Sequence, residues 1–404
     1  MAKKTTKPSY GFSSMRKTME TISKKTSILI EDDKTPAGFI DTGVYMLNAL
    51  FSKSIYGGVP NNRFSIFAGE EAVGKSYLCY SIARNAQKDG YCIIYIDTEY
   101  SIELHEMEEH GVDVSEDKLM LIRSNVVEDI KITLAQFLTD LKEQKIKGVD
   151  LDKIIIFIDS IGQLASRKEL QDAIDGKDKA DMTRAKAIKS LFRIITADLG
   201  FLNIPLICTN HIYLTTDLFP QAVQSGGTGM KYSPSVIVYL TKAKLKTGDE
   251  DELDLGSSGI VVTALARKNR KAKPKKIKFE ISHGKGMNKF KGLDYFCTLQ
   301  NFEKVGIAKV KPEVDKKTGE ITYKEGGNKW YVRHLDKSFF EKQLYTSKIF
   351  NKEVLDALEP IIKEYFSYAS IDEIDKIEKE MDELYEEYEK EFDIDEDDDD
   401  FILD

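Results

Sequence analysis

One stretch of the chain has the residue types and spacing that phosphate chemistry requires. It reads Gly69-Glu70-Glu71-Ala72-Val73-Gly74-Lys75-Ser76 and matches the pattern G-x-x-x-x-G-K-[ST] at every fixed position. Glycines let several backbone N–H groups approach phosphate oxygens closely, and the lysine adds positive charge at the β- and γ-phosphates. The hydroxyl of Ser76 is an oxygen ligand of the kind that Mg²⁺ prefers. The stretch therefore predicts a site for a nucleoside triphosphate and Mg²⁺.

The segments on both sides of this stretch fit the strand-loop-helix context of a phosphate-binding loop. Arg63–Ala68 is a short apolar run that predicts a buried strand, and Tyr77–Ala83 begins a helical pattern. The positive end of that helix would face the phosphates, so Tyr77 joins residues 69–76 as an expected cofactor-binding residue. With this context, a chance glycine-rich turn is the weaker interpretation.

Apolar strand candidates recur along the chain and indicate the fold class. They are separated by helical or polar connections, at least between the earlier ones: Arg63–Ala68, Tyr91–Ile96, Lys153–Ile158, Pro205–Thr209, Val236–Leu240 and Ile260–Leu265. Runs that are apolar at every position predict strands buried on both faces. We therefore expect an α/β fold with a mainly parallel sheet covered by helices.

Polar residues follow three of these strands, at the edge where open α/β sheets bind ligands. They are Asp97-Thr98-Glu99, Asp159-Ser160 and Asn210-His211. Asp159 follows an apolar strand, the pattern that places a carboxylate beside Mg²⁺ in nucleotide-hydrolysing proteins with a phosphate loop, so Ser76 and Asp159 are the predicted metal-binding residues. Glu99 is a candidate to orient or deprotonate a water molecule, and its alternative is a capping carboxylate.

Two further features each leave more than one interpretation open. His211 either senses a γ-phosphate through a hydrogen bond or has a structural role in the sheet. Residues 268–276, which begin Lys268-Asn269-Arg270, form the densest basic run of the chain. We consider three roles for this run: binding nucleic-acid phosphates, reaching the nucleotide of a neighbouring subunit, or forming a solvated loop.

Two long polar stretches follow the third and fourth predicted strands. The first runs from Arg167 to Arg184 with mixed charge, and the second, from Tyr213 to Lys231, contains Phe219 and the glycine-rich run 225–229. Loops of this length without secondary structure are usually functional. Their aromatic, glycine and basic residues favour a nucleic-acid backbone with stacked bases as the ligand.

The net charge of −9 is distributed unevenly along the 404 residues. Residues 371–404 contain 19 acidic residues and 3 lysines, a net charge of −16, so residues 1–370 carry +7. A basic body with an acidic tail is typical of proteins that bind polyanions, although a charge run is also often only a solvated segment.

Other features of the sequence limit the classes of protein to which the chain can belong. The four cysteines are scattered and form no C-x-x-C pair, which fits a reducing compartment and argues against a zinc or redox motif. The apolar runs are far shorter than the ~20 residues of a membrane helix. Residues 1–26 are rich in Lys, Ser and Thr, and an isolated apolar piece, Thr26–Ile30, pairs either with its own domain or with a neighbouring subunit. We expect a soluble intracellular protein with no membrane partner.

Taken together, these motifs resemble those of RecA-type recombinases. The order is the same: the phosphate loop, Asp97-Thr98-Glu99, Ile158-Asp159-Ser160-Ile161-Gly162, Asn210-His211, Gly226-Gly227-Thr228-Gly229 and Lys268-Asn269-Arg270. More narrowly, residues 181–186 and 189–194 are similar to the UvsX recombinases of T-even-type bacteriophages. The resemblance covers residues 35–300 well and residues 300–370 more loosely.

The resemblance implies an ATP-dependent filament on single-stranded DNA that pairs this strand with a homologous duplex and exchanges strands. It implies ATP and Mg²⁺ as cofactors and DNA-stimulated ATP hydrolysis with Lys75, Glu99 and His211 as catalytic residues. It places Lys268 and Arg270 at the ATP of the adjacent subunit. The DNA-binding residues that it implies lie in the two polar stretches: Arg167, Lys168, Arg184, Phe219, Gly226 and Gly227.

The family also implies partners, a location and a domain division. The partners are single- and double-stranded DNA, further copies of the chain, a recombination mediator and a single-stranded DNA-binding protein, in the cytoplasm of a bacterial host. The expected parts are a basic N-terminal arm and oligomerisation segment (1–38), a RecA-like ATPase core with DNA-binding loops (39–300), a small C-terminal domain (301–370) and an acidic tail (371–404). The alternatives are a ring helicase with the same core and an ATP-switched recombination mediator.

Overall fold

A computed structural model gives the conformation of residues 38–176, 183–214, 222–224, 232–245 and 259–369. Contacts divide the chain into two units, Met1–Gly38 and Phe39–Asp404, and nearly all described residues belong to the second. Several predictions lie outside the described residues: those for the N-terminal arm, Thr26–Ile30, Phe219, Gly226, Gly227 and the acidic tail.

The core is a ten-stranded sheet with the strand order β12-β11-β10-β9-β3-β7-β6-β4-β5, to which β8 is added beside β7. Six of these strands are parallel: β3 (Phe64–Gly69), β4 (Tyr91–Asp97), β5 (Leu119–Arg123), β6 (Lys153–Asp159), β7 (Leu206–Leu214) and β9 (Val236–Lys244). The chain therefore has the predicted α/β fold, and each predicted strand occurs. The edge strand β5 was not predicted.

Three strands extend the parallel sheet in the antiparallel sense. β10 (Gly259–Asn269) pairs with β9, β11 (Lys276–Ser282) with β10, and β12 (Gly286–Met287) with β11. A predicted strand at 260–265 is thus present but runs opposite to β3. Its end, which carries Lys268, lies at the amino ends of the parallel strands because Lys268 is paired with Ile237 at the start of β9.

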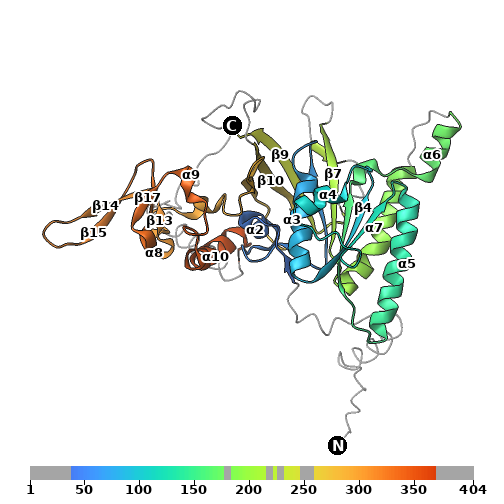
Figure 1. Ribbon diagram of the computed structural model, residues 1–404, viewed down its shortest axis with the longest axis horizontal. Helices are drawn as coiled ribbons and strands as arrows, with labels where there is room; N and C mark the ends of the chain where they lie inside the picture. The colour runs from blue at the N-terminus through green and yellow to red at the C-terminus, as the bar shows by residue number, and fades with distance from the viewer. Residues whose placement is uncertain (1–37, 177–182, 215–221, 225–231, 246–258, 370–404) are drawn as a thin grey trace, which may run out of the picture. The chain divides into compact units, whose positions relative to one another are not determined.

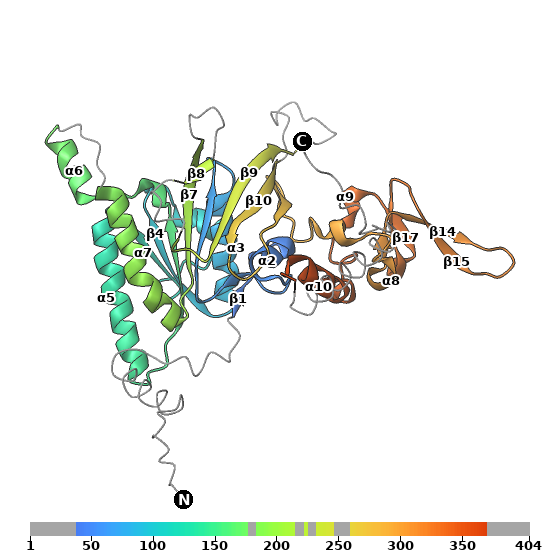
Figure 2. The ribbon, with the colours of Figure 1, turned by 180° about the vertical axis from the view of Figure 1, so that it is seen from behind.

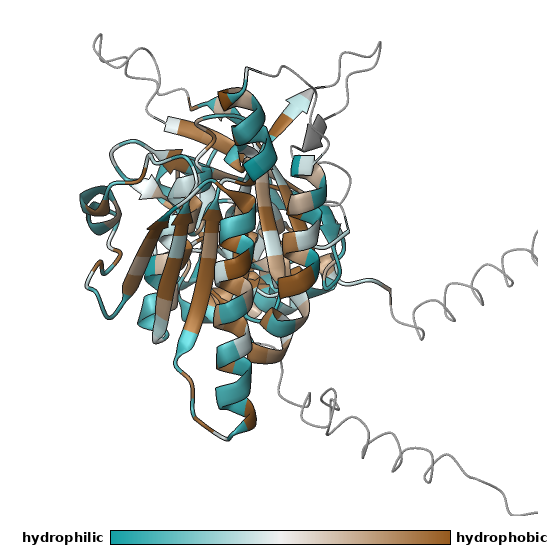
Figure 3. Cartoon of the chain, turned by 90° about the vertical axis from the view of Figure 1, so that its right-hand side faces the viewer, coloured by the Kyte–Doolittle hydropathy of each residue, from teal (hydrophilic) through white to brown (hydrophobic). Residues whose placement is uncertain are grey.

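Helices cover both faces of the sheet (Figures 1 and 2). α5 (Val127–Ile146) and α7 (Thr183–Leu202) lie side by side and pack their apolar residues on one face, in a cluster with Ile156 and Ile158. α2 (Tyr45–Ser52) and α3 (Lys75–Lys88) pack on the other face with Phe67 and Phe157. The central strands are hydrophobic along most of their length, as expected for strands buried on both faces (Figure 3).

The sequence accounts for the ends of two core helices in different ways. α5 carries Glu128 and Asp129 in its first turn and Lys145 in its last, which complements the helix dipole. α3 begins at Lys75, directly after Gly74, whose left-handed backbone (φ 89°) ends the phosphate loop. Glycine adopts this conformation without steric cost, so the position of Gly74 explains why the helix begins at the next residue.

The C-terminal part of the described chain is built of short elements. They are η3 (Leu293–Phe296), α8 (Phe302–Val305), β13 (Ile307–Ala308), β14 (Val310–Val314), β15 (Ile321–Glu325), β16 (Trp330–Val332), β17 (Lys337–Phe339), α9 (Glu341–Leu344) and α10 (Lys352–Phe366). α10 packs against α2, and the carboxylate of Glu359 accepts a 2.9 Å hydrogen bond from the N–H of Ile55. Trp330 and Phe366 lie in the same apolar cluster as α2 and α3. The predicted boundary at residue 300 stays a prediction.

The two polar stretches contain secondary structure that the sequence did not predict. In the first, α6 (Arg167–Ile174) begins with a capping box in which Ser166 and Glu169 exchange hydrogen bonds, and α7 starts at Thr183. In the second, β7 continues to Leu214 and pairs with β8 (Ala222–Gln224) as an antiparallel hairpin. The remaining short elements are β1 (Phe39–Ile40), β2 (Val59–Pro60), α4 (Leu104–Glu109), η1 (Ile161–Gln163) and η4 (Arg333–Leu335).

Candidate nucleotide-binding site

The phosphate loop lies between β3 and α3 at the carboxyl edge of the parallel strands. Ala72 and Gly74 both have positive φ, 54° and 89°, so the loop turns tightly. A Cβ on Gly69 would lie 2.7 Å from the carbonyl oxygen of Leu240 and 2.9 Å from Val73, so only glycine fits there. The first glycine of the pattern thus lets the loop pass beside β9.

Lys75 is held inside this loop. Its ammonium group donates to the carbonyl oxygens of Gly69 (3.1 Å) and Glu70 (2.7 Å), and only 8% of the residue is exposed. Burial lowers the pKa of Lys75, while the nearby carboxylates of Asp159 and Glu99 act in the opposite direction. A cation that is partly stripped of water in this way interacts strongly with an anion that enters the loop.

Ser76 and Asp159 form the oxygen pair predicted for Mg²⁺. The hydroxyl of Ser76 donates to the carboxylate of Asp159 at 2.8 Å. Tyr95 donates to the same carboxylate oxygen at 2.9 Å, and Thr209 donates to the other. Burial raises the pKa of Asp159, and these three hydrogen bonds counteract it.

This pair fits a magnesium ion that is shared with phosphates. Mg²⁺ is usually bound through one or two carboxylates, waters and substrate phosphates, not by a cage of protein ligands. The described part of the chain contains no group of three His, Cys, Asp or Glu residues arranged for a metal. A hydroxyl and a single buried carboxylate next to the phosphate loop are what such an ion requires.

Glu99 lies beside this pair, on the segment that follows β4. Its position is fixed by Asp97, which is fully buried and whose carboxylate accepts hydrogen bonds from the N–H groups of Glu99 (3.1 Å) and Ile102 (3.1 Å). The carboxylate of Glu99 accepts a 2.6 Å hydrogen bond from the hydroxyl of Ser160. Nε2 of His211 lies 3.3 Å from the same carboxylate oxygen. The structure thus brings all three predicted catalytic residues to one edge of the sheet.

Strand register explains why these residues meet. Asp97 is paired with Asp159 across β4 and β6, and Gly69 is paired with His211 across β3 and β7. β7 lies between β3 and β6, so it carries His211 beside the first glycine of the phosphate loop and Thr209 beside Asp159. The sequence predicted that these strand ends carry the site, but it could not show which strand lies in the middle.

Lys268 and Arg270 lie at the other edge of the sheet. Both donate to the carbonyl oxygen of Tyr232, at 2.8 and 3.3 Å, and burial together with the charge of Arg270 lowers the pKa of Lys268. At ~3.3 Å per residue, the six residues of β3 place about 17 Å between its amino end and the phosphate loop. These two residues therefore lie at the opposite end of the strands from the phosphate loop of their own chain.

The described residues among those predicted to bind DNA lie around the first polar stretch. Arg167 is exposed and forms an ion pair with Asp129, and Lys168 forms one with Asp172 at 3.0 Å. Arg184, near the start of α7, donates from its guanidinium to the carbonyl oxygens of Gly162 and Leu164. Their DNA contacts stay predictions.

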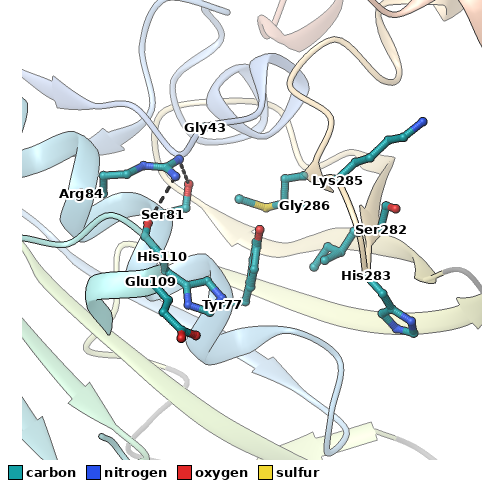
Figure 4. A pocket seen from close by; sticks show the side chains of 13 residues that line it. Gly43, Tyr77, Ser81, Arg84, Glu109, His110, Ser282, His283, Lys285 and Gly286 are labelled. Atoms are coloured by element: carbon teal, nitrogen blue, oxygen red, sulfur yellow. Dashed lines mark hydrogen bonds between the residues drawn. The ribbon is translucent and has the colours of Figure 1, made fainter. Parts of the chain in front are cut away.

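The sequence did not predict a cavity of about 530 Å³ beside α3 (Figure 4). It lies between Tyr77 on one turn of the helix, Arg84 further along, and the hairpin of β11 and β12 with His283 and Gly286. The ring of Tyr77 packs edge-on against His110, 4.9 Å away. Of the residues that line the cavity, Tyr77 was predicted from the sequence as a cofactor-binding residue.

The fold and the site together define a nucleotide-binding protein with a phosphate loop at the edge of a mainly parallel α/β sheet. Comparison with known proteins identifies the family. The model of the RecA N-terminal domain matches residues 13–288, and the chain therefore belongs to the RecA family, as its motifs predicted. None of the described helices is both long and apolar enough to cross a membrane.

Two relatives show the extent of the similarity. The chain is 29% identical to the recombination and repair protein of Enterobacteria phage T4, over 79% of this chain and 78% of the relative. It is 28% identical to protein RecA of Nautilia profundicola, over 69% of this chain and 75% of the relative. The resemblance to phage recombinases is thus confirmed alongside that to the bacterial proteins.

Proposed function

We propose that this protein is an ATP-dependent recombinase that assembles into helical filaments on single-stranded DNA and catalyses homologous pairing and strand exchange. One observation carries the proposal: Glu99, beside the phosphate loop, is hydrogen-bonded to His211 on β7, and β7 leads directly into the second polar stretch. The named relatives, a recombination and repair protein and RecA, support it at the level of the whole protein.

The residues of the site have complementary roles in ATP hydrolysis. Lys75 and the N–H groups of the loop bind the β- and γ-phosphates, and the cavity beside Tyr77 has the volume and position to hold the nucleoside. Ser76 and Asp159 would hold Mg²⁺, and the ion would supply positive charge at the phosphates. Glu99 accepts a proton from the attacking water, and His211 donates a hydrogen bond to the γ-phosphate or to Glu99.

The placement of Lys268 and Arg270 supports assembly of several copies. They cannot serve the phosphate loop of their own chain, which lies at the opposite edge of the sheet. In a head-to-tail polymer, the same edge of one subunit faces the phosphate loop of the next, and two cations there would stabilise the charge that develops on the phosphates. ATP would thus be enclosed between subunits.

The edge of the sheet at β5 offers a place where another copy can add. Among the described strands, β5 has a partner on one side only, β4, and Met120 in the middle of the strand is 57% exposed. An unpaired edge readily accepts a further strand. Thr26–Ile30 of a neighbouring copy is the segment with the appropriate sequence.

The family and the phage relative support a proposal for the cellular location and the partner proteins. We propose that the protein acts in the cytoplasm of a bacterial host, together with a recombination mediator and a single-stranded DNA-binding protein. The basic charge of residues 1–370 favours DNA as the ligand of the two polar stretches.

The direct test is the rate of ATP hydrolysis with and without single-stranded DNA. The proposal predicts slow turnover alone and a rate at least tenfold higher with DNA, as occurs when a ligand completes a catalytic arrangement. ATP binding without turnover under both conditions would instead favour the ATP-switched mediator. Duplex unwinding that tracks hydrolysis would favour the ring helicase.

A further inference from the structure

A short turn connects the catalytic edge of the sheet to the first polar stretch. It is the 3₁₀ turn Ile161–Gln163, which follows Asp159 and Ser160 and precedes Ser166. Arg184 holds this turn from outside, since its guanidinium donates to the carbonyl oxygens of Gly162 and Leu164. An arginine makes two such bonds from one rigid planar group, so it fixes both carbonyls relative to each other.

Gly162, at the centre of this turn, is pressed against the imidazole of His211. A Cβ on Gly162 would lie 2.7 Å from Cδ2 of His211 and 3.5 Å from the hydroxyl of Ser160. Contacts below 3.0 Å force a neighbour to move, so the bare backbone of Gly162 forms one wall of the position that the imidazole occupies. A shift of the turn toward the imidazole would therefore displace His211.

His211 and Ser160 in turn hold the carboxylate of Glu99. Ser160 donates to Oε1 at 2.6 Å, and Nε2 of His211 lies 3.3 Å from the same oxygen, so the tautomer with a proton on Nε2 donates to it. A carboxylate that acts on a water molecule must be placed within one hydrogen bond of it. The two donors thus determine where Oε1 of Glu99 points.

The first polar stretch is tied to this arrangement at both of its ends. The hydroxyls of Ser166 and Thr183 are 3.0 Å apart, so the two ends of this stretch lie against each other. Arg184 follows Thr183 directly. A ligand that displaces the end of this stretch at Thr183 would act on Arg184 and, through it, on Gly162.

We propose that Arg184 is a positioning residue for ATP hydrolysis: it holds Gly162 against His211 and so sets the hydrogen bond between His211 and Glu99. The inference rests on the proposed function and deepens it. It gives the first polar stretch its own connection to Glu99, separate from the connection of the second stretch through β7. It also assigns Arg184 a role other than a simple contact with a DNA phosphate.

A positioning role and a contact with a DNA phosphate predict different kinetic and binding changes in the variant Arg184→Gln. A lost phosphate contact lowers DNA affinity and reduces the slope of log K against log salt by about 0.7 for single-stranded DNA, while kcat recovers at saturating DNA. A lost positioning residue lowers kcat even at saturating DNA and ATP. Since small misplacements of a catalytic group cost up to about 100-fold in rate, we expect a loss of roughly 10- to 100-fold with KM for ATP changed less than about twofold.

The matched control is Arg193→Gln, which removes an exposed arginine from the same helix, α7. A second variant, Gly162→Ala, leaves Arg184 intact and pushes the imidazole of His211 directly. We expect it to lower kcat to a similar extent. In the double variant, the two losses should be clearly less than additive in free energy, because both act through His211.

A measurement without nucleotide reports on the same contact. The chain has five histidines, so ¹H–¹⁵N spectra of the imidazoles are simple, and His211→Gln assigns the signal of His211. We expect Arg184→Gln and Gly162→Ala to shift this signal and Arg193→Gln to leave it unchanged. Arg184→Lys, which keeps the charge but not the planar fork, should resemble Arg184→Gln.

The outcomes separate this inference from the proposed function. Loss of kcat and a shifted His211 signal in both variants support it; if Arg184→Gln does not fold, Gly162→Ala decides alone. If the wild type hydrolyses ATP with DNA stimulation but Arg184→Gln matches Arg193→Gln, or loses only DNA affinity and salt dependence, the inference is wrong and the proposed function stands. If the wild type does not hydrolyse ATP at all, both are wrong.

Discussion

At the residue scale, Lys75 provides the main positive charge within the phosphate loop. We expect Lys75→Ala to lose nucleotide binding by at least tenfold, because a charge-assisted contact with phosphate is worth roughly 1.5–3 kcal/mol. Equilibrium titration with a fluorescent ATP analogue measures this. Lys88→Ala, in the last turn of the same helix, is the control and should bind normally. Unchanged affinity in Lys75→Ala would contradict the assignment of the site.

We expect replacement of Glu99 to have a different effect from replacement of Lys75. Glu99→Gln keeps the size of the side chain and its hydrogen bond from Ser160 but cannot accept a proton, so we expect ATP-dependent DNA complexes that hydrolyse ATP about 100-fold more slowly. Single-turnover hydrolysis and DNA binding are the two measurements. Glu103→Gln, on an exposed carboxylate nearby, should behave as the wild type. Normal turnover in Glu99→Gln would show that another group activates the water.

Sequence predicts this site well at the level of residue types. The spacing of the phosphate loop and the polar residues after three strands predicted Lys75, Asp159, Glu99 and His211, and the structure places them near one another. It did not reveal that Thr209 and Tyr95 hold Asp159, or that Arg184 binds the turn at Gly162. These contacts join residues from separate strands and helices, and their spacing along the chain carries no signal.

At the scale of elements, the central strands of the sheet were predictable and their order was not. Continuous apolar runs such as residues 154–158 are clear signals, whereas the position of β7 between β3 and β6 depends on pairings between distant segments. The same holds for α6 and the β7–β8 hairpin, which arise from a capping box and a strand extension within stretches that looked irregular. Polar composition alone does not distinguish an exposed short helix from a loop.

The orientation of β10 leads to a prediction about cooperation between subunits. If Lys268 and Arg270 act on the ATP of a neighbour, then Arg270→Ala and Lys75→Ala are each inactive, but a mixture of the two regains activity. An intact loop from one variant meets intact cations from the other at roughly a quarter of randomly formed interfaces. The measurement is the DNA-stimulated ATPase rate of the equimolar mixture.

The control for this experiment is a mixture of Lys75→Ala with Glu99→Gln. Both changes damage the same side of the interface, so no pairing of these two variants restores a site. Absence of recovery in the first mixture, despite co-assembly of the two proteins on DNA, would show that Arg270 acts within its own subunit.

At the scale of the whole molecule, the charge distribution is the feature that sequence shows most directly. Residues 371–404 carry −16 and the rest of the chain +7. We expect truncation after Ser370 to tighten binding to single-stranded DNA several-fold and to reduce its dependence on Mg²⁺, because an acidic segment competes with DNA for basic surfaces and is screened by salt. DNA affinity across a salt series measures this, and a tail of equal length with amide side chains serves as the control. Weaker binding after truncation would contradict the charge argument.

The central claim, a filament on single-stranded DNA that requires ATP, is tested most directly by electron microscopy of the purified protein. The samples are the protein with single-stranded DNA and a non-hydrolysable ATP analogue, with either ligand alone, and with neither. We predict regular helical filaments when both ligands are present, with ATP enclosed between the phosphate loop of one subunit and Lys268 and Arg270 of the next. Closed rings under the same conditions would contradict the claim and favour a helicase.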